Sequence, residues 1–363
     1  MRVWCTALLA LTLGAAPAGA IFRAADLVVV PVAASLPGFN QSGWHTDLEI
    51  LNVDSVAIDV MIIFLPTGNF SNTLWYDNIA NHLGGRSADG FGYVKEELKD
   101  IAPGRAVILR DVVKETWGDG RKGALLIFAY EAGTLMTTTP PGGKPKLIRV
   151  TSRTYDLDFV TPEDPDPDDG QSPKPVPVTY GQQIPGLPWY YYLDMFQTAK
   201  GFNSVTFTGI EESADYRTAI GFVNISDRLT ALEVRCILKA ADGTELKDIG
   251  IIVQSLAHEQ FDMAVRSLFG LTPEDYPEVK GATVTISVKN AQSSAADPTP
   301  ALIVYGSRID NRTNDPVYLE QAFAVELPWD CVFNGNCRSA AGASIPSPWQ
   351  RPRPLQPPIA LRR

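Results

Sequence analysis

"GWHTDLEILNV" at Gly43–Val53 and "DYRTAIGFVNI" at Asp215–Ile225 are two versions of one phrase, and this repetition decides how the chain is interpreted. Both phrases place an aromatic residue, a basic residue and a threonine before an apolar run that ends at Asn followed by Val or Ile. A second match follows in the same order, "KGALLIF" from Lys122 and "KGATVTI" from Lys280. Self-similarity that keeps its order along the chain predicts an internal duplication.

A third match, "SRTY" from Ser152 and "SRID" from Ser307, shows that the two copies differ in length. The matched residues are 172 positions apart in the first phrase, at Asn52 and Asn224, and only 155 apart in the third. The first copy therefore carries an insertion, which we place near residues 72–100.

Between these phrases the apolar residues alternate or form short β-branched runs, which is the pattern of strands. Examples are "AIDVMIIFL" and "ALLIFAY" in the first copy and "ALEVRCILK" and "ATVTISV" in the second. Turn signals such as Asp242-Gly243 separate the runs. Many short strands with little helix predict an all-β fold of two tandem antiparallel β-sandwiches, Ig-like or related, over residues 21–188 and 189–330. Each sandwich is expected to enclose its own core.

Each copy also contains one candidate for a short helix, "DVVKETWG" from Asp111 and "DMAVRSLFG" from Asp262. Gly118 and Gly270 follow these segments, as C-cap glycines do. We assign Trp117 to core packing, with a ligand platform as the alternative.

Residues 1–20 carry one positive charge, an apolar stretch and the small residues Ala18-Gly19-Ala20, which is the pattern of a cleaved secretory signal peptide. The alternative, a membrane anchor, needs about 20 consecutive apolar residues, and this stretch is shorter. We therefore expect a secreted chain with no transmembrane span after cleavage. About 340 residues then remain, which exceeds the size of a single core, so two domains are expected.

The charge of the chain excludes one class of partner. Removing the positive charge of residues 1–20 and the five arginines of residues 338–363 from the formal charge of −10 leaves −16 for residues 21–337. A body this acidic repels phosphate backbones, so nucleic acid is excluded. Residues 331–363 include the Arg/Pro-rich end and predict a disordered C-terminal tail, with contact to an anionic envelope surface or a partner as the alternative.

Three cysteines lie beyond residues 1–20. Cys331 and Cys337 enclose "VFNGN", whose Asn-Gly pair suits a tight turn, and in an oxidising compartment they are expected to form a small disulfide loop. Cys236 lies in the alternating run "ALEVRCILKA", which indicates a small buried hydrophobic residue rather than a nucleophile.

Four polar residues of the repeated strands are candidates for structural roles. Asn52 and Asn224 close the first phrase in each copy, and Arg153 and Arg308 lie at the ends of runs that otherwise indicate buried strands. An inward arginine needs an acidic or carbonyl partner, because an unpaired buried charge is very costly. Since both copies carry the arginine, we expect a structural brace in each half rather than one ligand site.

The phrases "GWHTDLEILNV", "APG", "LRDVV", "KGALLI", "SRTY", "TYGQQIPGL", "YRTAIGFVN" and "SRIDNRTNDPVY" together resemble those of a group of exported bacterial tandem β-proteins with no assigned activity. The resemblance covers roughly residues 28–323. It implies an all-β pair of modules in the cell envelope or outside the cell, and it implies no catalytic residues.

Two loops contain residues that bind calcium in other settings. Residues 161–178 are acidic and rich in Pro, but their spacing departs from that of an EF-hand, which indicates an exposed loop. Asp310, Asn314 and Asp315 in "DNRTNDPVY" offer oxygen atoms, in a pattern that Asx-rich turns also produce. We therefore expect no cofactor, with a structural calcium ion at these three residues as the alternative.

Motifs for catalysis are few. The chain has three histidines, His45, His82 and His258, and it has no G-x-S-x-G elbow, C-x-x-C pair or phosphate-binding glycine loop. Asp156 and Asp158 lie two apart, hence on one face of a strand, and are the carboxylate pair that a hydrolase would use. We predict that the chain is not an enzyme.

Aromatic residues are the candidates for ligand binding, namely Trp75 and Tyr76, and Trp189, Tyr190 and Tyr192 in "PWYYYLDMF". Aromatic faces suit sugars, and aromatic edges suit protein interfaces. As a strand, the second segment would present Tyr190 and Tyr192 on one face. For this segment we favour packing between the two domains, with ligand binding as the alternative.

These observations predict a non-catalytic structural, adhesive or assembly protein of the bacterial envelope or extracellular space, with an envelope or extracellular protein or glycan as partner. The first alternative is a carbohydrate-binding module that uses exposed aromatics, and the second is an uncommon hydrolase. An exposed strip of coplanar aromatics would favour the first alternative, and a deep pocket with convergent carboxylates would favour the second.

Overall fold

The computed structural model describes residues 24–37, 43–68, 71, 92–93, 96–134, 144–160, 176–195, 202–226, 230–293 and 299–324. Several predictions concern residues outside these ranges and stay predictions: the signal peptide, most of the insertion, Trp75 and Tyr76, most of the acidic loop, the Cys331–Cys337 loop and the tail.

The described part of the first half forms strands β1 to β9, together with one 3-10 turn and one helix. In chain order the elements are β1 (Leu27–Pro37), β2 (Gly43–Asn52), β3 (Ile58–Pro66), β4 (Gly92–Tyr93), the 3-10 turn η3 (Glu96–Leu98), β5 (Ala106–Leu109), the helix α2 (Val112–Trp117), β6 (Arg121–Glu131), β7 (Ile148–Val160), β8 (Val176–Pro185) and β9 (Leu187–Pro188).

The second half begins with the 3-10 turn η4 and contains strands β10 to β18. The elements are η4 (Trp189–Tyr191), β10 (Ser204–Glu212), β11 (Tyr216–Asn224), β12 (Thr230–Lys239), β13 (Glu245–Val253), β14 (His258–Phe261), the helix α3 (Ala264–Ser267), β15 (Val279–Ser293), β16 (Leu302–Asp310), β17 (Pro316–Leu319) and β18 (Ala322–Ala324).

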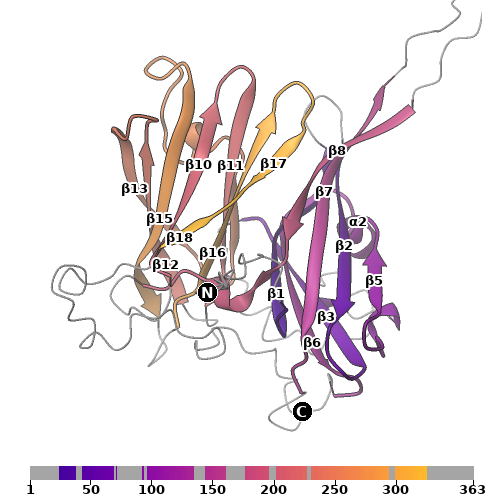
Figure 1. Ribbon diagram of the computed structural model, residues 1–363. Helices are drawn as coiled ribbons and strands as arrows, with labels where there is room; N and C mark the ends of the chain where they lie inside the picture. The colour runs from indigo at the N-terminus through magenta and orange to yellow at the C-terminus, as the bar shows by residue number, and fades with distance from the viewer. Residues whose placement is uncertain are drawn as a thin grey trace, which may run out of the picture.

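Strand pairing follows the same plan in both halves (Figure 1). The first half has the order β4-β3-β6-β1-β2-β7-β8, with β5 beside β2 and β9 beside β1. The second half has one sheet ordered β13-β12-β15-β10-β18 and another ordered β14-β11-β16-β17. Each antiparallel pairing of the second half is a first-half pairing with both strand numbers raised by nine. The all-β prediction is confirmed, and descent by internal duplication stays a prediction.

The threonine of the repeated phrase has the same role in both copies. Thr46 Oγ1 accepts from the backbone N–H of Ala34 at 2.8 Å and donates to the carbonyl of the same residue at 3.2 Å. Thr218 Oγ1 makes the same two bonds with Glu211, at 2.9 and 2.7 Å. Each threonine thus ties the second strand of its half to the backbone of the first strand, where a buried hydroxyl needs such partners.

The apolar side chains form two main clusters, whose division differs from the division of the chain into halves. The first cluster surrounds β1, β3 and β6 and also contains Val223, Ile225, Leu256, Ala301 and Ile303 from the second half. The second cluster lies among the strands of the second half. The prediction that each half encloses its own core is therefore corrected, because side chains of the second half complete the first core.

Three short segments test the local predictions. Both predicted helices are present, and Gly118 is the C-cap of α2, with a φ angle of 96° that suits glycine. The C-cap prediction is wrong for Gly270, because α3 ends at Ser267 and Leu268 is its C-cap. The segment from Trp189 was predicted as a strand and is the 3-10 turn η4 instead. A turn places Trp189 and the next residue, Tyr190, in the same core, whereas a strand would point one of them away.

Candidate functional site

The outer face of the β14-β11-β16-β17 sheet lies against the first half, and this contact creates the site. Residues of β11 alternate between the two faces of the sheet. Ile220 and Phe222 face the second core, whereas Ala219 and Gly221 lie opposite Ser307 and Tyr305 of β16 on the other face. On that face Ser307 Oγ donates to Gln182 Oε1 of the first half at 3.1 Å.

Gly221 is required by the close approach of Tyr305. A Cβ atom at Gly221 would lie 2.0 Å from Tyr305 Cε1, far inside van der Waals contact. The glycine therefore allows the Tyr305 ring to lie across β11 and to pack with Val32 and Ile184 of the first half. Complete burial raises the pKa of the Tyr305 hydroxyl, which stays protonated and available as a donor.

His258 links the two halves through a continuous chain of hydrogen bonds. Its Nδ1 lies 2.7 Å from Thr67 Oγ1, and its Nε2 lies 3.2 Å from the Tyr305 hydroxyl, which itself donates to Gln260 Oε1. The chain is consistent if Thr67 donates to Nδ1 and His258 carries its proton on Nε2. Burial, followed by the positive charge of Lys122, lowers the pKa of His258 to about 3, so the ring is neutral at physiological pH.

A cavity of about 700 Å³ lies between the two halves, and we call it the inter-half cleft. Its walls come from β1, β2, β6, β7 and β8 on one side and from β11, β14, β16 and β17 on the other. Val32, Leu36, Trp44, Ala219 and Ile309 are among its apolar lining residues. The volume lies within the range of about 300–1,000 Å³ that small-molecule sites occupy.

One polar edge of the cleft is an ion pair between the halves. Lys122 Nζ donates to both carboxylate oxygens of Asp262 at 2.9 Å, and Gln260 Nε2 donates to the same carboxylate. Gln260 also accepts from Tyr305, so this edge continues the hydrogen-bond chain of His258. The side chains at this edge are held in fixed positions before any ligand arrives, which favours recognition.

Arg217 is the second cation of the cleft. Its Nη1 donates to Asn311 Oδ1 at 2.8 Å, and its Nη2 donates to Asn314 Oδ1 at 3.0 Å. Burial lowers the pKa of Arg217, while the carboxylates of Asp262, Asp156 and Asp310 act in the opposite direction. An arginine remains charged under such a shift, so the guanidinium is a fixed positive group in a partly dry cleft.

The equivalent positions of the first half carry a hydrogen-bonded pair on an outer sheet face. His45 and Asp111 correspond to Arg217 and Asp262 in the matched phrases, and His45 Nδ1 lies 2.7 Å from Asp111 Oδ2. The Asp111 N–H donates to Asp47 Oδ1 at 2.9 Å. This pair ties β2 to the start of α2, which is a structural task.

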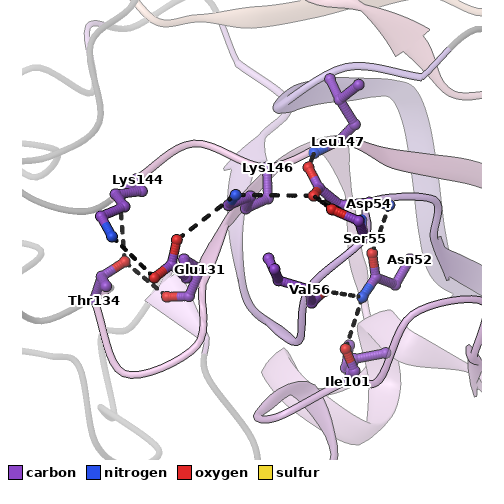
Figure 2. A network of polar contacts seen from close by, with 10 residues as sticks. All are labelled: Asn52, Asp54, Ser55, Val56, Ile101, Glu131, Thr134, Lys144, Lys146 and Leu147. Atoms are coloured by element: carbon purple, nitrogen blue, oxygen red, sulfur yellow. Dashed lines mark hydrogen bonds and ion pairs between the residues drawn. The ribbon is translucent and has the colours of Figure 1, made fainter.

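Asn52 and Asn224 have matching environments, as their places in the repeated phrase suggested. Asn52 Nδ2 donates to the carbonyls of Val56 and Ile101 at 2.8 Å, and its Oδ1 accepts the Asp54 N–H at 2.8 Å (Figure 2). The acidic and basic side chains drawn beside it, Asp54, Glu131, Lys144 and Lys146, form a surface network around the same turn.

Asn224 repeats this arrangement in the second half. Its Nδ2 donates to the carbonyls of Thr230 and Gln254 at 2.9 Å, and its Oδ1 accepts the Ser226 N–H at 2.9 Å. Both asparagines have no exposed surface. Each one therefore satisfies backbone groups at a buried strand end, where water cannot.

The expectation of equivalent arginine braces is wrong for Arg153. Arg308 fits it, since Nη1 lies 3.8 Å from Glu211 Oε2 and the guanidinium lies over the Tyr216 ring. Arg153 is exposed and donates to Thr179 Oγ1 at 2.8 Å. The cause is register: Arg308 pairs with Thr218, whereas Arg153 pairs with Asp47, one position beyond the equivalent threonine. The two arginines therefore face opposite sides of equivalent sheets.

The aromatic segment predicted to bind ligands is interior. Trp189, Tyr190 and Tyr192 are 6%, 4% and 0% exposed, and they belong to the first core. Trp189 Nε1 donates to Asp26 Oδ1 at 2.9 Å, so the indole N–H is also satisfied within the protein. These three residues therefore pack between the halves, as the favoured interpretation of this segment expected, and do not offer an exposed surface to a ligand. Trp75 and Tyr76 lie outside the described residues.

The calcium candidates at the β16–β17 turn have protein partners. Asp310 Oδ1 accepts the N–H groups of Arg312 and Thr313 at 2.7 and 3.1 Å, which is an Asx turn. Asn314 Oδ1 accepts a hydrogen bond from the Arg217 guanidinium, whose positive charge would repel a calcium ion at the same oxygen. Asp315 follows in the same turn. Among the described residues, no cluster of three or more His, Cys, Asp or Glu side chains is arranged to hold a metal ion.

The remaining chemical candidates are dispersed. Asp156 is 1% exposed on β7, whereas Asp158, two residues further along the same strand, is exposed. Cys236 is fully buried, and burial raises the pKa of its thiol, in keeping with a packing role.

Sequence reasoning missed the cleft, although several of its residues stand in matched segments. Trp44 and Arg217 belong to the first phrase, and Lys122 and Asp262 to the second match and the helix candidate. A signal was present: the second copy has small residues where the first has acidic ones, and small outward residues on a strand indicate close approach by another segment.

Comparison with known protein families, curated proteins and solved structures found no match to this chain. No helix within the described residues has the length and apolar character needed to cross a membrane.

Proposed function

We propose that this chain is a non-catalytic, exported recognition protein of the bacterial envelope or extracellular space, which serves adhesion or assembly by holding a ligand in the inter-half cleft. The observation that carries the proposal is the cavity of about 700 Å³ between two sheets, with apolar walls and a few fixed polar groups. Concave sites of this composition are the usual form of a ligand pocket.

The polar groups of the cleft support binding rather than catalysis. Asp262 in the cleft lining is engaged by Lys122 and Gln260. His258 is fully buried, and both of its ring nitrogens are engaged, by Thr67 and Tyr305. A general base needs a lone pair directed at a substrate proton, whereas the lone pairs of Asp262 and His258 accept hydrogen bonds from protein groups. Export is supported by the character of residues 1–20.

The test is a binding screen of the mature chain against glycans, peptides and envelope extracts, with two matched variants. Ala219→Phe fills the cleft from β11, and Glu49→Phe adds the same ring on the exposed outer face of β2. Circular dichroism and thermal unfolding are the checks that both variants are folded. We expect a ligand that binds the wild type and Glu49→Phe but not Ala219→Phe. Equal binding by all three proteins, or binding by none, would overturn the proposal.

A further inference from the structure

Trp44 gives the cleft a flat apolar surface at the end of β2. It lines the cavity together with Leu36 and Pro37 of β1, and its side chain is half-buried. An indole face in such a position can stack on the C–H face of a sugar ring or on another flat apolar group. Trp44 was not among the aromatics that the sequence singled out for this role.

The charges that act in the cleft include no excess of positive charge. Lys122, Arg217 and Asp262 line it, and Asp156 and Asp310 act electrostatically on Arg217. Two cations and three carboxylates leave no net positive charge to attract an anion. An anionic ligand would have to compete with the carboxylate of Asp262 for Lys122, and the carboxylate would then be left without its cation, which is costly. Both cations are already engaged by protein groups, so the cleft favours an uncharged ligand over an anionic one.

The polar lining supplies acceptors as well as donors. Gln182, Asn311 and Gln260 carry amides, and Ser307 and Thr154 carry hydroxyls. Their oxygens retain acceptor capacity, because an amide oxygen has two lone pairs and a carboxylate has about four. Hydroxyl groups both donate and accept, so a ligand rich in hydroxyls can use such a lining fully, whereas an apolar ligand would leave it unsatisfied.

We infer that the inter-half cleft binds a short, uncharged oligosaccharide, with one sugar ring on the Trp44 indole and sugar hydroxyls on Gln182 and Asp262. The inference deepens the proposed function and rests on it. A proline-containing peptide and an anionic glycan are the two other ligands that an aromatic-lined, partly charged cleft could select, and the experiment separates them.

The experiment measures binding of the mature chain to arrays of neutral glycans, acidic glycans and proline-rich peptides, followed by calorimetry on the strongest neutral glycan. We expect Trp44→Ala to weaken that binding at least about tenfold, and Trp44→Phe to weaken it much less because a ring is retained. Arg153→Gln, on the outer face of the same sheet, is the control and leaves binding unchanged. The dissociation constant should change less than about twofold between low and high salt, because an uncharged ligand is not screened.

If Trp44→Ala misfolds, Ala219→Phe tests the same site from the opposite wall. Binding of acidic glycans with a strong salt dependence, or of peptides alone, would contradict the inference that the ligand is an uncharged oligosaccharide. If Ala219→Phe blocks that binding, the proposed recognition function would still hold. Neutral-glycan binding that survives both Trp44→Ala and Ala219→Phe would overturn the cleft as the site. Binding of no ligand class would overturn the recognition function itself.

Discussion

Replacing Asn224 with alanine is expected to lower the free energy of unfolding by about 4–6 kcal/mol. The Asn224 side chain makes three short hydrogen bonds, to the carbonyls of Thr230 and Gln254 and from the N–H of Ser226, each at 2.9 Å. Each such bond contributes about 1 kcal/mol, and backbone groups left buried without a partner add about 1–3 kcal/mol. Asn224 has no exposed surface, so water cannot replace the lost amide.

The assay is urea unfolding followed by circular dichroism, with the midpoint and slope fitted for each protein. Asn52→Ala should cost a similar amount, because Asn52 makes the equivalent three bonds in the first half. Asn290→Ala is the control, since Asn290 is exposed on β15, and it should cost less than about 0.5 kcal/mol. The reasoning is refuted if Asn224→Ala is as stable as Asn290→Ala at an unchanged slope.

Three further changes address the contact between the halves and the second core. Gly221→Ala should lower stability by about 3 kcal/mol or more in thermal or urea unfolding, because a Cβ there would lie 2.0 Å from the Tyr305 ring; an unchanged midpoint would contradict the close approach. His258 is neutral in the folded protein and takes up a proton on unfolding between about pH 6.5 and 3. As the pH is lowered through this window, the free energy of unfolding should therefore decrease by up to about 1.4 kcal/mol per pH unit. The pH slope of wild type should therefore exceed that of His258→Gln, and equal slopes would contradict the shift. The Cys236 thiol should react with a disulfide reagent only in denaturant, and fast reaction of the native protein would place it at the surface.

Local sequence patterns predicted the strands well, because alternation of apolar residues is visible in one segment at a time. The run around Cys236 is an example, with buried and partly exposed residues alternating along β12. The register between neighbouring strands was harder to predict from the sequence. The phrases "SRTY" and "SRID" align in sequence, but Arg153 and Arg308 sit one position apart in the two ladders, and one position reverses the face of a side chain.

Most contacts between the halves could not be predicted, because they depend on how two sheets meet. Packing of the segment from Trp189 between the halves was expected from its aromatic residues, but its place in the core of the first half was not. His258 stands in a short strand signal, and nothing in the neighbouring sequence indicates Thr67 and Tyr305 as its partners. The cleft arises from the same long-range packing and was missed for the same reason.

The outward positions of one repeated strand explain why the two halves differ in use. These positions are His45, Asp47 and Glu49 in β2, and Arg217, Ala219 and Gly221 in β11. A face with two carboxylates incurs a desolvation cost if another sheet covers it, whereas Ala and Gly leave room for Tyr305 to reach across. Inward positions, Thr46 with Thr218 and Asn52 with Asn224, keep the same side chain because each half needs the same internal bonds. The repeated inward residues thus specify the fold of each half, and the unlike outward residues specify which sheet face forms a wall of the cleft.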